Sequence, residues 1–153
     1  MRFLDLSPAE TAFLSAPFPA PDGFETRLTR KLAATLSARL RLAVALRMQP
    51  TVEPVDPPQA PVWAPDSALA DVWLTRRLGG RRAVGAASFV PRTLIDTLDA
   101  ALAESWLDAD AQGLPAALTW QIAVASTQAS LAVQFPHQAT DMTRWAREVI
   151  RHG

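Results

Sequence analysis

Four arginines around a pair of glycines form the densest group of functional side chains in the sequence. Arg76, Arg77, Arg81 and Arg82 flank Gly79-Gly80. A guanidinium group binds a carboxylate through two parallel hydrogen bonds, and arginine is enriched at protein interfaces. The group predicts a docking surface for an acidic partner. The alternative is a solvent-exposed turn without a binding role.

Two tryptophans are the candidate apolar contacts beside these arginines. Trp73 directly precedes the arginine group, and Trp63 lies within a proline-rich stretch. Exposed aromatic side chains are enriched at interfaces. Trp63 is therefore expected to be an anchor packed onto the domain or a contact for a partner, and Trp73 is a second candidate contact.

The groups that could catalyse a reaction or bind a metal are scattered. His137 and His152 have no further ligands at the spacing of a zinc site, and Asp108 and Asp110 fit a solvated turn. The sequence contains no Cys, no Asn, no G-x-S-x-G and no phosphate-binding loop. We predict a non-enzymatic protein with no catalytic residue, cofactor or metal. An enzyme of unrecognised type stays as a rival, which a deep polar pocket near His137 would favour.

The formal net charge of zero conceals alternating blocks of charge. Residues 24–47 sum to +5, 72–92 to +5 and 93–141 to −6. A nucleic-acid-binding protein normally presents an unbalanced basic face. The pattern instead favours pairing of charged surfaces, within the chain or with protein partners, and is compatible with an oligomer.

The sequence also lacks the signals of a membrane or exported protein. No run approaches the roughly 18 apolar residues of a membrane span. Asp5 and Glu10 interrupt the segment in which a signal peptide would be apolar. We expect a cytoplasmic protein without membrane insertion.

The first half of the chain should position these groups with a helix, a strand and a loop. Residues 1–21 are expected to form a separate N-terminal segment with a short helix. An apolar residue at every fourth position predicts a helix over 22–40, whose remaining surface carries Arg27, Arg30, Lys31 and Arg39. Alternating apolar residues then predict a strand over 40–48, and six prolines predict a loop over 49–66.

The second half predicts a hairpin and further helices. A hairpin over 70–89 turns at Gly79-Gly80, and helices follow over 91–107, 115–130 and 140–151. Asp96, Asp99 and Glu104 lie away from the apolar stripe of the first of these helices. Residues 22–153 are thus expected to form one α+β domain. Its small antiparallel sheet, built from the helix-into-strand unit and the Gly-Gly hairpin, is packed by about four amphipathic helices.

The predicted helix runs into a strand over "FETRLTRKLAATLSARLRLAVALRM". A strand, a turn, a second strand and a helix are predicted over "DVWLTRRLGGRRAVGAASFVPRTLIDTLDAALAESW". "GLPAALTWQIAVAS" contains an "LP-x-x-L" helix pattern, and "LSPAETAFL" lies near the N-terminus. The order of these segments resembles the FliM and SctQ families, which form the flagellar motor switch and the sorting platform of type III secretion. The resemblance covers roughly residues 5–130.

This resemblance implies a scaffold of a bacterial type III secretion cytoplasmic ring. Its partners would be a surface-presentation domain protein, a platform adaptor and an ATPase regulator. Residues 131–153 do not resemble the family's C-terminal surface-presentation domain, so we expect a fragment, a split-gene product or a stand-alone relative. The related chemotaxis phosphatases need a catalytic Asn, which this sequence lacks. The alternative function is a type III secretion chaperone that binds a secreted effector, although such chaperones are usually acidic dimers.

Overall fold

A computed structural model describes residues 23–51, 56–77, 90–108 and 113–152 of the chain. These residues contain four helices and four strands, which confirms the α+β class. The elements in chain order are α2 (Phe24–Leu40), β1 (Val44–Gln49), β2 (Val62–Pro65), α3 (Ser67–Arg77), α4 (Arg92–Asp108), β3 (Ala117–Val124), β4 (Thr127–Gln134) and α5 (Ala139–His152).

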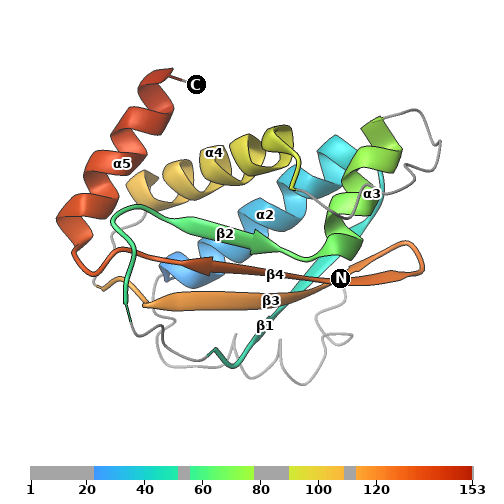
Figure 1. The fold of residues 1–153 in the computed structure, drawn as a ribbon, viewed down its shortest axis with the longest axis horizontal. Helices are drawn as coiled ribbons and strands as arrows, with labels where there is room; N and C mark the ends of the chain where they lie inside the picture. The colour runs from blue at the N-terminus through green and yellow to red at the C-terminus, as the bar shows by residue number, and fades with distance from the viewer. Residues whose placement is uncertain (1–22, 52–55, 78–89, 109–112, 153) are drawn as a thin grey trace, which may run out of the picture.

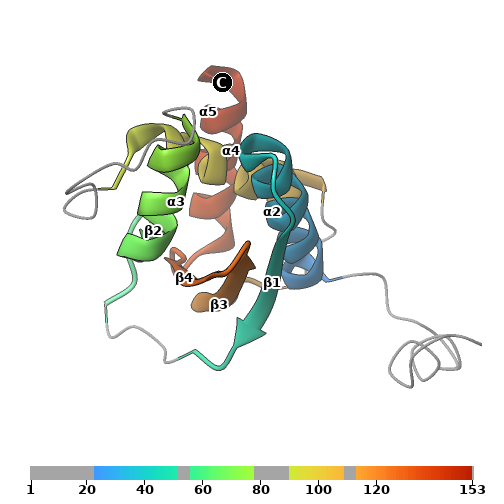
Figure 2. The same cartoon turned by 90° about the vertical axis from the view of Figure 1, so that its right-hand side faces the viewer.

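The four strands form one antiparallel sheet in the order β1-β3-β4-β2. Strands β3 and β4 form its centre and pair along their whole length, from Ala117 opposite Gln134 to Val124 opposite Thr127. Figures 1 and 2 show the helices gathered on one side of this sheet. The sheet therefore has an inner face toward the helices and an outer face away from them.

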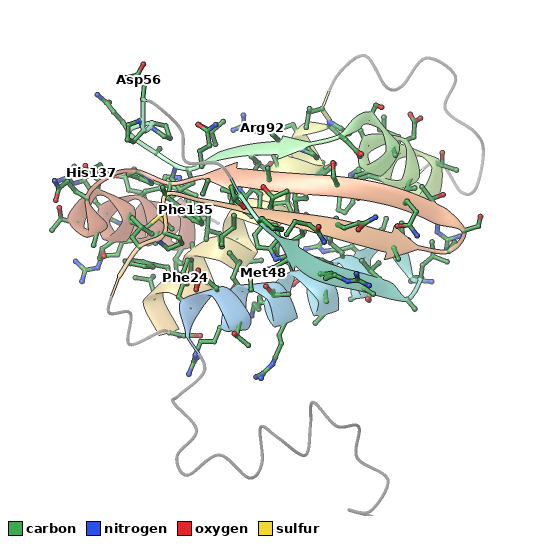
Figure 3. All side chains as sticks on the ribbon, turned by 90° about the horizontal axis from the view of Figure 1, so that it is seen from below. Phe24, Met48, Asp56, Arg92, Phe135 and His137 are labelled. Atoms are coloured by element: carbon green, nitrogen blue, oxygen red, sulfur yellow. The ribbon has the colours of Figure 1, made fainter. Side chains whose placement is uncertain are left out.

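The two faces of the sheet differ in composition. Leu118, Trp120, Ile122 and Val124 alternate along β3 and are all buried. The residues between them belong to the outer face, which Figure 3 views from below. That face is built mainly from small and uncharged polar side chains, and Gln121 donates a hydrogen bond to Gln128 across it at 3.3 Å. The apolar side chains of β3 are thus confined to the inner face, against the helices.

The predicted passage from a helix directly into a strand is confirmed at α2 and β1. The apolar stripe from Phe24 to Leu40 is buried at every fourth residue. Arg41 ends the helix in the left-handed conformation, with φ at 57°, and its N–H donates to the Ser37 carbonyl at 2.8 Å. The Val44 N–H then donates to Ser37 Oγ at 3.1 Å. These bonds satisfy groups at the helix end and direct the chain into β1.

The strand predicted at the start of 70–89 is wrong, because residues 67–77 form helix α3. Asp66 caps this helix, since its Oδ1 accepts the Leu69 N–H at 3.0 Å. Leu69, Ala70 and Trp73 are buried at helical spacing. Burial of this apolar stripe outweighs the strand preference of the Val-Trp-Leu-Thr run. The rest of the predicted hairpin, including Gly79-Gly80, lies outside the described residues.

The helix predicted over 115–130 is also wrong, because this segment forms β3 and the first part of β4. Leu118 and Ile122 are four apart, a spacing that suits one face of a helix and also one face of a strand. The deciding residues are Trp120 and Val124, which complete an alternation that buries all four side chains. The turn places Ala125 at φ 53°, without the glycine that normally indicates a tight hairpin turn.

The remaining elements agree more closely with the sequence. Helix α4 occupies 92–108 and α5 occupies 139–152, as predicted within two residues. The proline-rich segment is not loop throughout, since residues 62–65 form β2. This strand lies at the edge of the sheet, where a proline such as Pro65 removes no hydrogen bond from a central strand.

Four indole N–H groups connect the elements that surround the core. At 2.9 Å each, Trp63 donates to Asp99, Trp73 to Thr93, Trp106 to Thr143 and Trp120 to Thr29. Each bond joins two different elements, and together they involve β2, β3 and all four described helices. These tryptophans therefore add directional bonds to the non-directional packing of the core.

Candidate docking surface

Helices α2 and α4 lie side by side and run in opposite directions (Figure 1). Their buried stripes face the core, so each helix leaves a charged side toward solvent. Lys31 of α2 and Glu104 of α4 meet at 2.7 Å between them. This ion pair marks the middle of a shallow groove along the two helices.

The walls of this groove carry opposite charges. The basic ridge consists of Arg27, Lys31 and Arg39 on α2, and the acidic ridge consists of Asp96, Glu104 and Asp108 on α4. Neighbouring members of each ridge are four or eight apart and lie on one broad side of their helix, although the two end members, twelve apart, differ by about 120° around the helix axis. The predicted blocks of opposite charge are thus brought together along two neighbouring helices.

Two hollows lie along the groove, one on either side of the central ion pair. The first has a volume of about 390 Å³ and is lined by Thr35, Arg39, Asp96 and Ala100 among others. The second, also about 390 Å³, is lined by Arg27, Arg30, Ser105 and Asp108 together with Lys31. Both hollows therefore contain a basic residue of α2 and an acidic residue of α4.

Most charges of the groove are solvated. The side chains of Lys31 and Glu104 are 42% and 45% exposed. Asp96 pairs with Arg92 of its own helix at 3.1 Å, and both of these side chains are largely exposed. Arg39 makes no ion pair or side-chain hydrogen bond with the described residues. Such exposed groups contribute little to folding, and they remain available for contacts with another molecule.

Burial displaces the pKa of the Asp99 carboxyl on α4. Burial raises its pKa above the usual value, while the hydrogen bond from the Trp63 indole partly offsets this rise. Asp99 faces the interior side of α4 and accepts that bond at 2.9 Å. Asp99 therefore has a structural role, as the hydrogen-bond acceptor for the Trp63 indole at the edge of the core.

Trp63 and Trp73, the two candidate contact residues, are buried in the structure, which for Trp63 agrees with the alternative of an anchor packed onto the domain. Their side chains are 8% and 1% exposed, and their indole N–H groups are bonded inside the molecule to Asp99 and Thr93. They fill the space between the sheet and the helices, where large aromatic groups bury the most apolar area. Although its side chain is buried, Trp73 is one of the residues that line the first hollow of the groove.

The predicted arginine surface is only partly described. Arg76 is exposed, and its Nε donates to the Leu40 carbonyl at the end of α2 at 2.9 Å. A cation at this position also complements the negative end of the helix dipole. Arg77 lies in the last turn of α3, while Arg81 and Arg82 lie outside the described residues. Their predicted role in partner binding stays a prediction.

The groups considered for catalysis do not converge in the described part of the chain. His137 is exposed beside the start of α5 (Figure 3), and neither hollow of the groove includes it. No set of three or more potential metal ligands occurs among the described residues. Asp110 lies outside them.

Sequence reasoning placed charges on α2 and α4 but missed that the two charged sides border one groove. The signal was present in the spacing, because the charges recur every four or eight residues in both helices. The missing information was which helices are neighbours, because the spacing within each helix does not give its position relative to the other.

Comparisons with known proteins do not place the chain in a family. No family model matches the sequence, and no curated protein matches it significantly. None of the helices in the described residues is long and apolar enough to cross a membrane.

Proposed function

We propose that this chain is a non-enzymatic docking module of a bacterial type III secretion cytoplasmic platform. The observation that carries this proposal is the sorting of opposite charges onto the two walls of the α2–α4 groove. A long, shallow and solvated groove with separated charges suits a protein surface better than it suits an enclosed small substrate. Steering and register are the effects expected of such charges.

The type III secretion setting depends on the resemblance to the FliM and SctQ families. The α2–β1 unit supports it, because a helix passes directly into a strand as the resemblance implies. Two other segments depart from it, since 67–77 is a helix and 117–124 is a strand. The proposed neighbours are a surface-presentation domain protein, a platform adaptor and an ATPase regulator.

A type III secretion chaperone is the second candidate, and one observation favours it. It requires a small α+β domain, which the structure provides. The chaperone function does not depend on segments 67–77 and 117–124, whose observed structures differ from those implied by the platform families. The net charge of zero remains unlike the acidic charge that such chaperones usually carry.

Affinity purification of the tagged chain from its own bacterium distinguishes these functions. Platform components enriched with the chain, relative to an untagged strain, would support the docking module. Enrichment of a secreted effector without platform components would replace it by the chaperone. Recovery of neither class under secretion-inducing conditions would contradict both assignments.

A further inference from the structure

We propose that the α2–α4 groove binds the same groove of a second copy of this chain, with the basic ridge of each copy against the acidic ridge of the other. This inference rests on the proposed docking role of the groove and names its partner.

The charges of the two ridges lie at matching levels along the groove. Lys31 and Glu104 define the central level, since they are in contact. The two helices are antiparallel, so moving along the groove means counting forward in α2 and backward in α4. Eight residues after Lys31 and eight before Glu104 are Arg39 and Asp96, which line the same hollow. A step of four in the other direction reaches Arg27 and Asp108, which line the second hollow.

A two-fold axis along the groove makes this surface complementary to itself. Such an axis exchanges the two walls without shifting their levels, so α2 of one copy lies over α4 of the other. Arg39 then faces the second copy's Asp96, and Arg27 faces the second copy's Asp108. Because the interface is isologous, each of these pairs occurs twice. No sliding of one copy along the other is needed to match the charges.

The middle of the groove permits the two copies to approach. Between the central ion pair and the Arg39–Asp96 level lie Thr35 and Ala100, which are small and line the same hollow. Ala34 and Ala38 are exposed on the solvent side of α2. Small side chains between charged levels allow helices to pack closely while the longer side chains reach across.

The dimensions of the groove predict a weak and salt-sensitive association. Each helix of 17 residues is about 25 Å long, and packed helices are about 10 Å apart. The paired faces would bury about 1,000 Å² in total, at the lower limit of specific interfaces. With few apolar groups at its centre, the interface depends on charge, so the dimer should dissociate as salt shortens the Debye length to about 3 Å at 1 M.

Sedimentation velocity of two complementary variants tests the proposal. Variant A carries Arg27→Glu and Arg39→Glu, which replaces both outer cations of the basic ridge by carboxylates. Variant B carries Asp96→Arg and Asp108→Arg, which makes both walls basic. We expect the wild type to associate toward twice 16.6 kDa at roughly 10–500 μM and low salt, and each variant alone to be monomeric. Their mixture should recover the association, because the carboxylates introduced in A then face the arginines introduced in B, and Asp96 and Asp108 of A face Arg39 and Arg27 of B.

A matched control separates this pairing from general attraction between proteins of opposite net charge. Arg41→Glu with Arg47→Glu gives variant C, with the same charge as A from exposed positions outside the ridges. The mixture of C with B should associate far less than the mixture of A with B. Thermal unfolding confirms that each variant is folded, and Arg27→Glu and Asp108→Arg both agree with the dipoles of their helices.

The results that overturn the proposal are distinct from those that overturn the proposed function. A wild-type chain that is monomeric throughout this range, an association that survives in A, or equal association of both mixtures would each refute the paired grooves. A monomeric chain that still purifies with platform components would refute self-docking and leave the docking function intact. Salt-sensitive dimers recovered without platform components would support the paired grooves and contradict the platform assignment.

Discussion

The two sides of helix α2 carry out different tasks within the same 17 residues. Its inner side places Leu28, Leu32 and Leu36 against the core, each with no exposed surface. Its outer side presents Arg27 and Arg39 to solvent beside α4. The inner side is governed by burial of apolar area and the outer side by screened electrostatics. Substitutions on the two sides should therefore separate folding from association.

Replacing Leu32 by Ala tests the inner side and should have the largest effect on folding. The side chain is fully buried in the main core cluster, so truncation removes apolar burial and leaves a cavity. We expect a loss of about 2–5 kcal/mol in the free energy of unfolding. Chemical denaturation measures this loss, and Thr35→Ala on the outer side of α2 is the control. A loss of comparable size for Thr35→Ala would contradict the division of α2 into a folding side and an association side.

Replacing Thr29 by Val tests a polar contact at the border between the two sides. Thr29 Oγ1 accepts the Trp120 indole N–H at 2.9 Å, and the Trp120 side chain has no exposed surface. Valine keeps the shape but leaves this donor unpaired, which should cost about 1–3 kcal/mol. Thr29→Ser retains the hydroxyl. The account predicts a smaller loss for Ser than for Val in denaturant unfolding, and equal losses would contradict it.

The pH dependence of stability should reveal the buried carboxyl of Asp99. Its pKa is raised in the folded chain by burial, so the unfolded chain releases this proton at a lower pH. The free energy of unfolding should therefore fall as pH rises from the ordinary pKa of Asp through the raised value. Asp99→Asn keeps an oxygen acceptor for Trp63 without this titration.

The stability of Asp99→Asn relative to the wild type should thus increase between acidic and neutral pH. Denaturant unfolding of both proteins at about pH 3 and about pH 7 measures the difference. The corresponding change for Asp108→Asn, at an exposed carboxyl at the far end of the same helix, serves as the control. A pH-independent difference for Asp99→Asn would show that burial does not perturb this carboxyl.

Removing the central ion pair of the groove should have only a small effect on folding. Lys31 and Glu104 are in contact, but both side chains are nearly half exposed. Lys31→Met should lower the free energy of unfolding by less than about 1 kcal/mol, and less still at high salt. A loss comparable to that of Leu32→Ala would place the outer side of α2 among the determinants of the fold.

The paired change of Arg81 and Arg82 to Glu should leave folding unchanged and weaken partner binding. These arginines belong to the sequence-predicted docking surface, which the described residues do not include. Pull-down of the platform or effector partner measures binding, and a melting curve measures folding. Unchanged binding together with an unchanged melting curve would remove these arginines from the docking surface.

The sequence sufficed where one periodicity extended over a long segment. The apolar residue at every fourth position predicted α2, and the alternation after Leu40 predicted β1. It failed where a short pattern fitted two structures. Leu118 and Ile122 agree with both periods, and only the burial of Trp120 on the inner face selects the strand.

The candidate site was harder to predict because it depends on which elements are neighbours. The sequence left open whether Trp63 packs onto the domain or contacts a partner, because an indole is equally suited to fill a core and donate one bond there. The Asp66 cap, which also accepts hydrogen bonds from the backbone and hydroxyl of Ser130, links α3 to β4 over a long sequence separation. Contacts of this kind cannot be read from local spacing.

Site-specific cross-linking tests the central claim about the outer side of α2 most directly. The chain has no cysteine, so a single Cys can be introduced at Thr35 in one sample and at Ala100 in another. Under the two-fold arrangement Thr35 of one copy faces Ala100 of the other, whereas two Thr35 residues lie on opposite walls. Mass spectrometry of the oxidised mixture should show the mixed disulfide in excess over both homodimers at low salt. A statistical mixture, or equal cross-linking by Gln121→Cys on the outer face of the sheet, would contradict the paired grooves.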